Sequence, residues 1–406
     1  MTSVARDPRL IADRPGVAGT LEGFWRRVSQ GEIGSLPVVV GLLLIAIVFQ
    51  SLNPNFLTPR NLTNLVLQIA AMGTISVGVV LVLLLGEIDL SIGAVSGLCA
   101  AVMTVLNVKT GLPGALAVGA GLLLGAGIGG LQGVWVTRFR VPSFVVTLAG
   151  LLGWQGVLLY VLGDTGTVNL TDPAITNLAG IFLGRGLGWL IGTVAIAVFL
   201  ASLARRHRRR VAAGLAVGTR GGLVGRIVVV VGGILVAIAI LDADRGVPLA
   251  VLILLGLVVF FDYVTKRTRF GRHVFAVGGN AEAARRAGIG VDRVRVAVFT
   301  LSATLAACGG ILAASRLLAV NQSSGSGDVL LNAIAAAVIG GTSLFGGRGT
   351  IWSALLGALV IGSISNGMDL LALASSVKFM ITGGVLLAAV TIDAVSRRGR
   401  QAAGRA

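Results

Sequence analysis

Twelve apolar runs, most of them long enough to cross a lipid bilayer, divide the sequence between residues 36 and 393. An apolar helix of about 20 residues spans the roughly 30 Å hydrocarbon core, and its backbone polar groups must be satisfied within the helix. The sequence therefore predicts an all-α, polytopic membrane protein with about twelve transmembrane helices. The predicted spans are 36–52, 62–85, 90–108, 113–136, 142–163, 187–203, 227–241, 247–264, 296–315, 329–346, 350–370 and 376–393.

The basic residues crowd alternate loops. If the N-terminus lies in the cytoplasm, 27 of the 33 Lys and Arg residues fall on the cytoplasmic side. This asymmetry is the positive-inside bias of membrane proteins, and it places both termini in the cytoplasm. Two weak spans, 227–241 and 329–346, could instead be re-entrant or broken. The predicted divisions are a cytoplasmic N-terminal segment at 1–35, a transmembrane domain at 36–393, cytoplasmic loops at 204–226 and 265–295, and a cytoplasmic tail at 394–406.

The composition also indicates a membrane protein. Only 12% of the residues are charged, against about 25% in a typical soluble domain. The net charge of +17 comes from arginines in short loops, so topology explains it better than a nucleic-acid surface, and we expect no nucleic-acid partner. In one span Gly121, Gly125 and Gly129 share a helix face, where small residues let helices approach closely. We therefore expect a multi-pass protein of the cell membrane.

Ionisable side chains are scarce within the spans. Glu87 and Asp89 lie at the break between the second and third spans, and Asp262 and Asp369 lie near helix ends. Ion-coupled carriers keep charged groups inside the membrane, where a charge is costly and is retained for function. The scarcity therefore argues against a proton-driven carrier and against a charged substrate, and it favours a neutral solute.

The sequence carries no pattern for catalysis or nucleotide binding. The P-loop pattern is missing, because none of the three lysines follows a glycine. The patterns GxSxG, HExxH and CxxC are also missing. We therefore expect a transport protein that is not an enzyme, without cofactor or metal, which is powered by a separate ATPase or is a passive channel. An ion-coupled secondary carrier and a membrane-embedded transferase or hydrolase are the alternatives from other classes.

The loop 265–295 contains a segment, 279–289, with the start and stop signals of a helix. An asparagine suits the N-cap, and a glutamate follows in the first turn, where the helix dipole favours an anion. Two arginines occupy the last turn and a glycine suits the position after it. This helix could dock into a groove on a partner, or lie on anionic lipid as a basic helix. The docking candidates are Gly279, Asn280, Glu282, Arg285, Arg286 and Gly288.

Several stretches resemble bacterial ABC-type sugar permeases. Residues 270–289 are similar to the cytoplasmic loop of that family, and residues 86–94 (GEIDLSIGA) to its hallmark after the second helix. Residues 335–350 (AAAVIGGTSLFGGRGT) are a third match. With NPNF at 53–56 and NL at 61–62, the matches follow the family's order and indicate its monosaccharide branch of ribose-, xylose- and galactose-type permeases. The added stretch 204–247 resembles the xylose-transport members of that branch.

The resemblance implies partners and a mechanism. It implies a permease homodimer in the lipid bilayer, an extracytoplasmic sugar-binding protein, and a cytosolic ABC ATPase subunit that grips the 279–289 helix. The implied function is ATP-driven import of a neutral monosaccharide, D-xylose or a related pentose. Ribose, galactose, a nucleoside, an autoinducer or a branched-chain amino acid is the alternative solute within the family.

Polar residues in apolar surroundings are candidates for the solute path or its gate. Asp89 and Ser91 are also expected to cap the third helix, and the Gly340–Gly349 run is expected to form a tight turn. Interhelical hydrogen bonds explain the remaining polar residues equally well. The candidates for the path or gate are Asn64, Gln68, Glu87, Asp89, Ser91, Asn332, Thr342, Ser343 and Asn366.

Overall fold

The computed structural model describes residues 36–214 and 220–402, most of them in helices. The predicted segment 1–35 and the end of the predicted tail lie outside the described residues. The helices are α2 (Leu36–Leu52), α3 (Pro59–Leu84), α4 (Ile92–Val108), α5 (Gly114–Arg138), α6 (Ser143–Leu162), α7 (Pro173–Gly180), α8 (Arg185–Ala212), α9 (Arg220–Asp242), α10 (Leu249–Arg267), α11 (Arg269–Gly279), α12 (Ala281–Arg286), α13 (Val291–Leu317), α14 (Gly327–Ile339), α15 (Trp352–Leu370) and α16 (Ser375–Ala402). The other elements are the 3-10 helix η1 (Gly163–Thr165) and the strands β1 (Thr167–Asn169), β2 (Phe182–Leu183), β3 (Val247–Pro248) and β4 (Ala319–Asn321).

Eight helices in the described part of the chain are long and apolar enough to cross a membrane, judged by length and composition. Four more apolar helices are shorter: Val38–Leu52, Ile92–Val108, Asp328–Ile339 and Ser375–Ala388. These helices follow the predicted apolar runs in order, so the predicted helical, multi-pass architecture is confirmed. The number of twelve spans and the sides of the two termini stay predictions.

The region predicted as the basic loop 204–226 is largely helical. Helix α8 continues to Ala212, and α9 begins at Arg220. Arginine and alanine are good helix formers, so a run rich in both extends a helix that the apolar pattern alone would end earlier. The weak span 227–241 is accordingly part of an uninterrupted helix of 23 residues rather than a re-entrant segment.

The span predicted at 329–346 is shorter than expected. Helix α14 ends at Ile339 after 13 residues. The chain then turns at Gly341, whose φ of 104° lies in the left-handed region that ends helices. The second suspected break in the span pattern is therefore a real helix end.

Contacts between residues divide the chain into two compact units, which we describe separately. The smaller one contains α8 and α9 within Gly184–Gly246. In it the guanidinium of Arg185 and the indole N–H of Trp189 both approach Asp242 Oδ2, each at 3.2 Å. These contacts join the start of α8 to the end of α9, so the two helices form an antiparallel pair.

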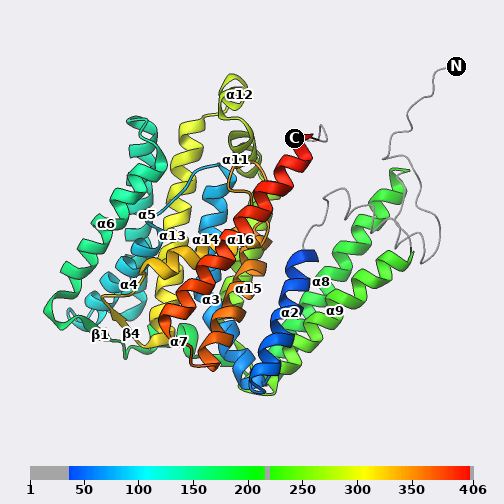
Figure 1. Ribbon diagram of the computed structural model, residues 1–406, viewed down its shortest axis with the longest axis horizontal. Helices are drawn as coiled ribbons and strands as arrows, with labels where there is room; N and C mark the ends of the chain where they lie inside the picture. Colours follow the sequence, from blue (N-terminus) through cyan, green and yellow to red (C-terminus); the bar gives the residue numbers. More distant parts are fainter. Residues whose placement is uncertain (1–35, 215–219, 403–406) are drawn as a thin grey trace. The chain divides into compact units, whose positions relative to one another are not determined.

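The larger unit comprises Ser35–Leu183 and Val247–Val395. At one end of its helical bundle β1 pairs antiparallel with β4, and β2 pairs antiparallel with β3. Figure 1 shows β1, β4 and α7 at this end and α12 at the other. The Ala174 N–H and the Asn107 amide donate hydrogen bonds to Asp172, and these bonds hold the pKa of its carboxyl below its usual range. The bond from Asn107 also ties the end of α4 to the start of α7.

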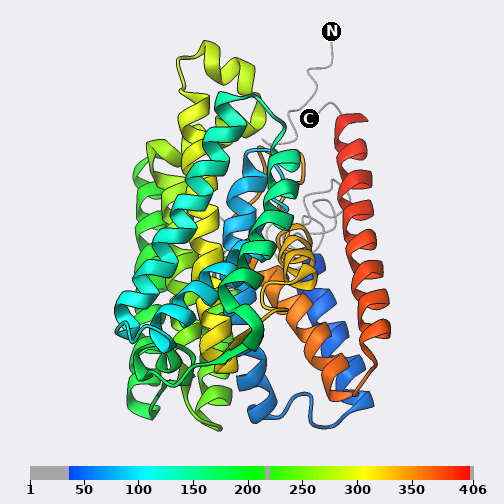
Figure 2. The same cartoon turned by 90° about the vertical axis from the view of Figure 1, so that its left-hand side faces the viewer.

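The opposite end of the larger unit brings together loops that the charge pattern assigns to the cytoplasm. Helix α3 ends there beside the end of α11 and the loop 340–350. The first turns of α6 meet the residues that follow α3, because the Ile88 and Leu90 N–H groups donate hydrogen bonds to Ser143 Oγ and Thr147 Oγ1. Arg138 ends α5, and Arg140 lies in the short loop before α6. Figure 2 shows α11 and α12, in yellow-green, at the top of the bundle. We call this end the α12 end and the other the strand end.

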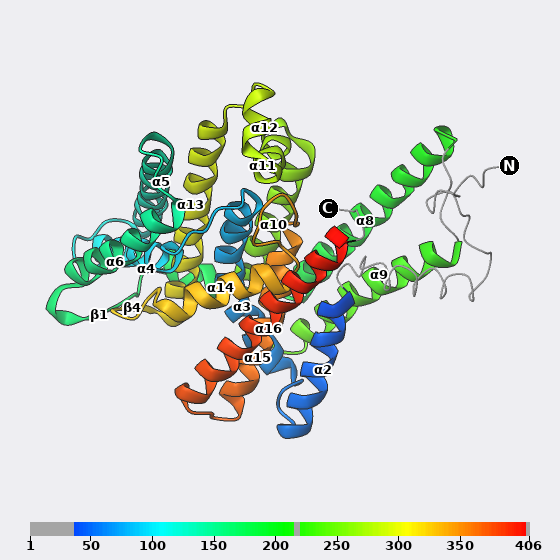
Figure 3. The same cartoon turned by 45° about the horizontal axis from the view of Figure 1, so that its top comes forward.

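Helix α13 lies at the centre of the larger unit, where it contacts α3, α4, α5 and α7. Its packing against α5 uses the predicted glycine face. A Cβ atom on Gly129 would lie 2.3 Å from the Phe299 carbonyl oxygen, and one on Gly125 would lie 2.7 Å from the Ala307 Cβ. The packing role predicted for these glycines is therefore confirmed. Helix α14 lies against α3 and α15, as can be followed in Figure 3.

Candidate functional site

The predicted docking segment forms the capped helix α12. Asn280 is its N-cap, and its Oδ1 accepts a hydrogen bond from the Ala283 N–H at 2.9 Å. Gly288 has a φ of 82°, in the left-handed region expected just after a helix. The helix itself spans Ala281–Arg286, which is shorter than the predicted 279–289, because residues 279 and 287–289 make up its caps and flanks.

The outer surface of α12 is charged. Glu282 forms ion pairs with Arg285 at 3.1 Å and with Arg286 at 3.4 Å, and all three side chains are more than half exposed. A second helix, α11, precedes α12 and was not predicted as a helix. Its start is capped by Thr268, whose Oγ1 accepts a hydrogen bond from the Gly271 N–H at 3.2 Å. The loop between α10 and α13 is therefore a helix pair rather than one helix in a basic loop.

Glycines join this helix pair to the bundle. A Cβ atom on Gly278 would lie 1.8 Å from the Leu84 carbonyl oxygen at the end of α3. The Gly347 N–H donates a hydrogen bond of 3.0 Å to the same oxygen. A Cβ atom on Gly346 would lie 2.7 Å from the Gly278 carbonyl oxygen and 2.8 Å from the Gly86 nitrogen. We call these five residues the glycine junction; in it three backbones touch with no room for side chains.

The residues after α3 form the α3–α4 break, Leu85–Ser91, which is held from two sides. The Leu90 N–H donates to Thr147 Oγ1 at 3.0 Å, which ties the break to α6. Glu87 Oε1 lies 2.8 Å from Arg295 Nη2 in the first turns of α13, and the two side chains are 15% and 26% exposed. Because α13 follows α12 closely in the chain, this partly buried ion pair links the break to the α12 end of the bundle.

A buried polar chain starts from the same break. Ser91 donates a hydrogen bond of 2.7 Å from Oγ to Asp89 Oδ1, and the Gln132 amide on α5 donates one of 2.9 Å to Ser91 Oγ. Ser91 holds the N-cap position of α4, but its side chain makes no capping bond. The predicted capping by Ser91 is therefore wrong, because its hydroxyl is used by Asp89 instead. Asp89 also borders a cavity of about 110 Å³ shared with Leu344.

The loop between α14 and α15 forms the predicted tight turn. Thr342 is buried, and its Oγ1 has no hydrogen-bond partner within the described residues. Ser343 Oγ accepts a bond of 3.2 Å from the Phe345 N–H, which stabilises the turn. Positive φ angles, which glycine adopts without strain, occur at Gly341, Gly346, Gly347 and Gly349.

A pocket of about 260 Å³ with a mixed polar and apolar lining lies towards the strand end between α14, α15 and α16. Asn332 lines it, and its Oδ1 is buried with no hydrogen-bond partner within the described residues. Asp369 forms an ion pair with Lys378 at the pocket wall. The further lining residues include Asp328, Ser365, Phe379 and Thr382. Carboxylates, an amide, hydroxyls and one aromatic ring are groups that can orient a small polar molecule.

The remaining candidates for the path do not gather around one cavity. Asn366 is paired with Asn61 of α3 through two amide hydrogen bonds of 2.7 and 3.1 Å. This pair accounts for the burial of Asn366 without a solute. Asn64 is exposed and Gln68 is partly buried, both on α3. The structure thus places Glu87, Asp89 and Ser91 in the α3–α4 break, where Glu87 is paired with Arg295 of α13, and it places Asn332 in a pocket of its own.

Three residues that take part in these contacts were not predicted from the sequence. Gln132 is a lone amide in an apolar span, and the criterion applied to Asn64 would have found it. Arg295 and Lys378 have no such signal, because their carboxylate partners lie on other elements and only the fold pairs them.

The fold and the site define a class. It is a multi-pass membrane protein in which the helix pair α11 and α12 is joined to one end of the bundle by direct backbone contacts. Residues 61–390 match the family model described as "Branched-chain amino acid transport system / permease component". The chain belongs to this family of membrane permease components.

Named relatives fall within this class. The chain is 38% identical to the xylose transport system permease protein XylH of Escherichia coli K12 over 343 residues, which cover 84% of this chain and 87% of that one. It is 34% identical to XylH of Haemophilus influenzae, over 90% of this chain and 98% of that one. It is 32% identical to the ribose import permease protein RbsC of Escherichia coli K12, over 87% and 92%. No solved structure matches the chain. The expected resemblance to monosaccharide permeases of the cell membrane is confirmed.

Proposed function

We propose that this chain is the membrane-spanning subunit of an ATP-driven importer of a neutral monosaccharide, with D-xylose or a related pentose as its solute. The observation that carries the solute class is the 38% identity to a xylose permease over 84% of the chain. The lower identity to a ribose permease makes D-ribose the second candidate. The scarcity of ionisable residues within the spans supports a neutral solute and an external source of energy.

The α12 helix is the proposed contact with the ATPase subunit. It is exposed, has its own caps, and presents Glu282, Arg285 and Arg286 on its surface. Its base is continuous with α11, which meets α3 at the glycine junction. Because closely packed protein interiors are barely compressible and transmit strain, a displacement of α12 would also displace the end of α3 and the α3–α4 break. Glu87, Asp89 and Ser91 are therefore proposed as parts of the gate that this motion operates.

The pocket of Asn332 is the proposed place where the sugar enters from the strand end. An unpartnered buried amide oxygen is costly, and a sugar hydroxyl would satisfy it by donating a hydrogen bond. The pocket volume of about 260 Å³ equals roughly nine waters at about 30 Å³ each, which is close to the roughly ten heavy atoms of a pentose molecule or twelve of a hexose. A binding protein outside the cell would deliver the sugar here, and a second copy of the permease would complete the path.

Solute identity is tested by uptake into vesicles that contain the permease, its ATPase and its binding protein. We expect labelled D-xylose to accumulate with ATP, and unlabelled D-xylose to compete better than D-ribose or D-galactose. Asn332→Leu should raise the half-saturating sugar concentration, whereas Asn366→Leu, away from the pocket, should leave it unchanged. Equal effects of the two variants would exclude this pocket, and accumulation of leucine but not of pentoses would exclude the sugar.

The docking role is tested separately by co-purification of the permease with the ATPase. Arg285→Glu reverses a charge on α12, and Arg208→Glu reverses an exposed one on α8, which serves as the control. We expect the first variant to insert normally but to retain at most about a tenth of the ATPase, because reversing a charge at an interface costs several kcal/mol. Full retention of the ATPase by Arg285→Glu would remove α12 from the interface.

A further inference from the structure

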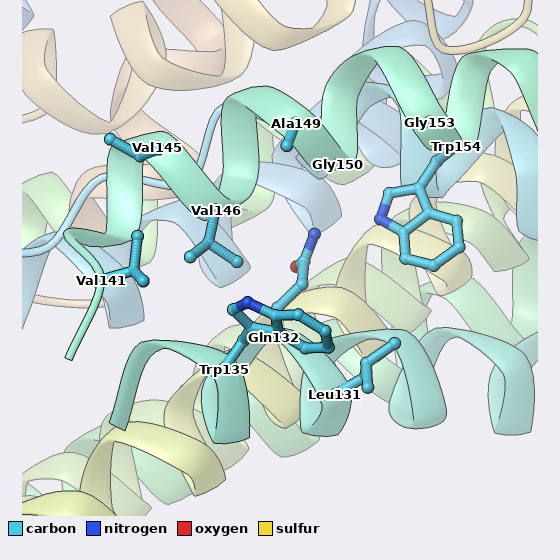
Figure 4. A pocket seen from close by; sticks show the side chains of 10 residues that line it. All are labelled: Leu131, Gln132, Trp135, Val141, Val145, Val146, Ala149, Gly150, Gly153 and Trp154. Atoms are coloured by element: carbon cyan, nitrogen blue, oxygen red, sulfur yellow. The ribbon is translucent and has the colours of Figure 1, made fainter. Parts of the chain in front are cut away.

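An apolar groove of about 390 Å³ runs along the outside of the larger unit, between α5 and α6. Trp135 and Trp154 line it, and the amide of Gln132 lies between the two helices beside Gly150 (Figure 4). Most residues of α6 are not buried, so in a membrane this side of the bundle meets lipid. An apolar groove at such a surface is filled by the apolar part of its surroundings.

A charged pocket of about 500 Å³ lies at the α12 end of this groove. Glu87 is paired with Arg295, and Arg285 is paired with Glu282 on α12. Arg140 and Asp292 are both left without an ion pair within the described residues. The charged side chains that line the pocket are Glu87, Arg140, Arg285, Asp292 and Arg295. Of its three arginines, only Arg140 has no carboxylate partner in the described part of the chain.

The two cavities adjoin, because Val141 lines both. The residue before it, Arg140, has a φ of 55°, a left-handed conformation that costs energy for any residue other than glycine. Such strain persists where the surrounding structure requires it, and it tends to occur at functional positions. Here it holds a positive side chain at the border between an apolar groove and a charged pocket.

We propose that the groove and the charged pocket together bind one anionic phospholipid, with an acyl chain between Trp135 and Trp154 and the phosphate against Arg140. An amphiphile matches an apolar groove that is continued by a charged pocket with an unpaired arginine at the border. The predicted topology puts this end in the cytoplasmic leaflet, and basic pockets between helices on that side suit anionic headgroups. The lipid would lie beside the Glu87–Arg295 ion pair and Arg285 of α12.

The headgroup half is tested by native mass spectrometry of the delipidated, full-length permease titrated with dioleoyl phosphatidylglycerol or dioleoyl phosphatidylcholine. Arg140→Gly removes the charge and relieves the backbone strain. Arg138→Gln, the control, removes an exposed charge that does not line the pocket. We expect Arg140→Gly to bind phosphatidylglycerol at least about fivefold more weakly and to lose the preference over phosphatidylcholine, as expected for one arginine at a membrane surface. Arg138→Gln should change binding less than twofold.

Binding of the acyl chain is tested at two glycines of α6, where an added Cβ atom would meet nothing within 4 Å. Gly153 lines the groove and Gly156 does not. Gly153→Phe should fill the groove and weaken the binding of both lipids, and Gly156→Phe should bind both as the unmodified chain does. Thermal unfolding of each variant shows that the fold is intact.

Three results would overturn the proposal. The first is unchanged phosphatidylglycerol binding by Arg140→Gly, and the second is an equal loss in Arg138→Gln, which would indicate diffuse surface charge. The third is displacement of the lipid by inorganic phosphate at millimolar concentration, which would indicate a phosphate site without an acyl chain. None of these measurements involves transport, so their outcome does not depend on which solute the permease carries.

Discussion

The glycine junction predicts a sharp effect for a single methyl group on Gly278. The Cβ atom of an alanine there would lie 1.8 Å from the Leu84 carbonyl oxygen and 2.8 Å from the Gly347 nitrogen, whereas ordinary contacts lie at 3.4–4 Å. The backbones of α11 and α3 would have to separate by about 1.6 Å. Both clashing atoms belong to the backbone and cannot turn aside, so we expect an overpacking cost of about 1–3 kcal/mol.

The neighbouring glycine provides the control for stability. A Cβ atom on Gly279 would meet nothing within 4 Å, so Gly279→Ala should unfold at the temperature of the unmodified chain or slightly higher. Gly278→Ala should unfold several degrees lower in the same detergent, since 1 kcal/mol shifts the midpoint of a large domain by about 2–4 °C. Fluorescence-monitored thermal unfolding of the two variants measures this difference.

The same variant tests the path of coupling. If α12 drives the α3–α4 break through the junction, Gly278→Ala should still bind the ATPase but should import less sugar for each ATP hydrolysed. Gly256→Ala on α10, where a Cβ atom also has open space, is the transport control because Gly279 lies within the proposed docking segment. Unfolding temperature and coupling ratio equal to those of the controls would refute the close contact and the role given to it.

Two further predictions concern packing within the larger unit. Gly129→Ala should lower thermal stability by about 1–3 kcal/mol, because its Cβ atom would lie 2.3 Å from the Phe299 carbonyl oxygen; Gly127→Ala, in open space on the same helix, should be neutral or slightly stabilising. Asn366→Leu should cost about 1–3 kcal/mol, because Asn61 Oδ1 loses its donor while Asn61 Nδ2 keeps only its bond to the Phe56 carbonyl oxygen. In the Asn366→Leu variant, a further Asn61→Leu replacement should lower stability much less than Asn61→Leu does in the unmodified chain. Additive losses of stability would show that the two amides act independently.

Local features of the fold were predictable where a few neighbouring residues decide them. The N-cap at Asn280, the left-handed Gly288 and the turn after Gly341 all follow from side-chain and backbone preferences. The glycine face of α5 was predictable because its period matches a helix. Helix α8 continues beyond the predicted span 187–203, and α14 ends before the end of the run 329–346, which was suspected of being broken. Hydropathy reports where a chain is apolar and not where a helix stops.

The contacts that assemble the site were not predictable in this way. Asn61 and Asn366 are 305 residues apart in the sequence, and nothing near either residue indicates the other. The same holds for Glu87 with Arg295, and for Gly278 with Leu84. A sequence can show that Gly278 is a glycine, but only the packing of α11 against α3 shows why a methyl group has no place there.

The source of energy for transport is the most direct test of this account. Proteoliposomes would carry the permease with its ATPase inside and the binding protein outside, and uptake of labelled D-xylose would be measured with ATP, without ATP, and with a proton or sodium gradient alone. We predict accumulation with ATP only, and none when the ATPase is omitted. Accumulation by the permease alone, driven by either ion gradient, would contradict the account.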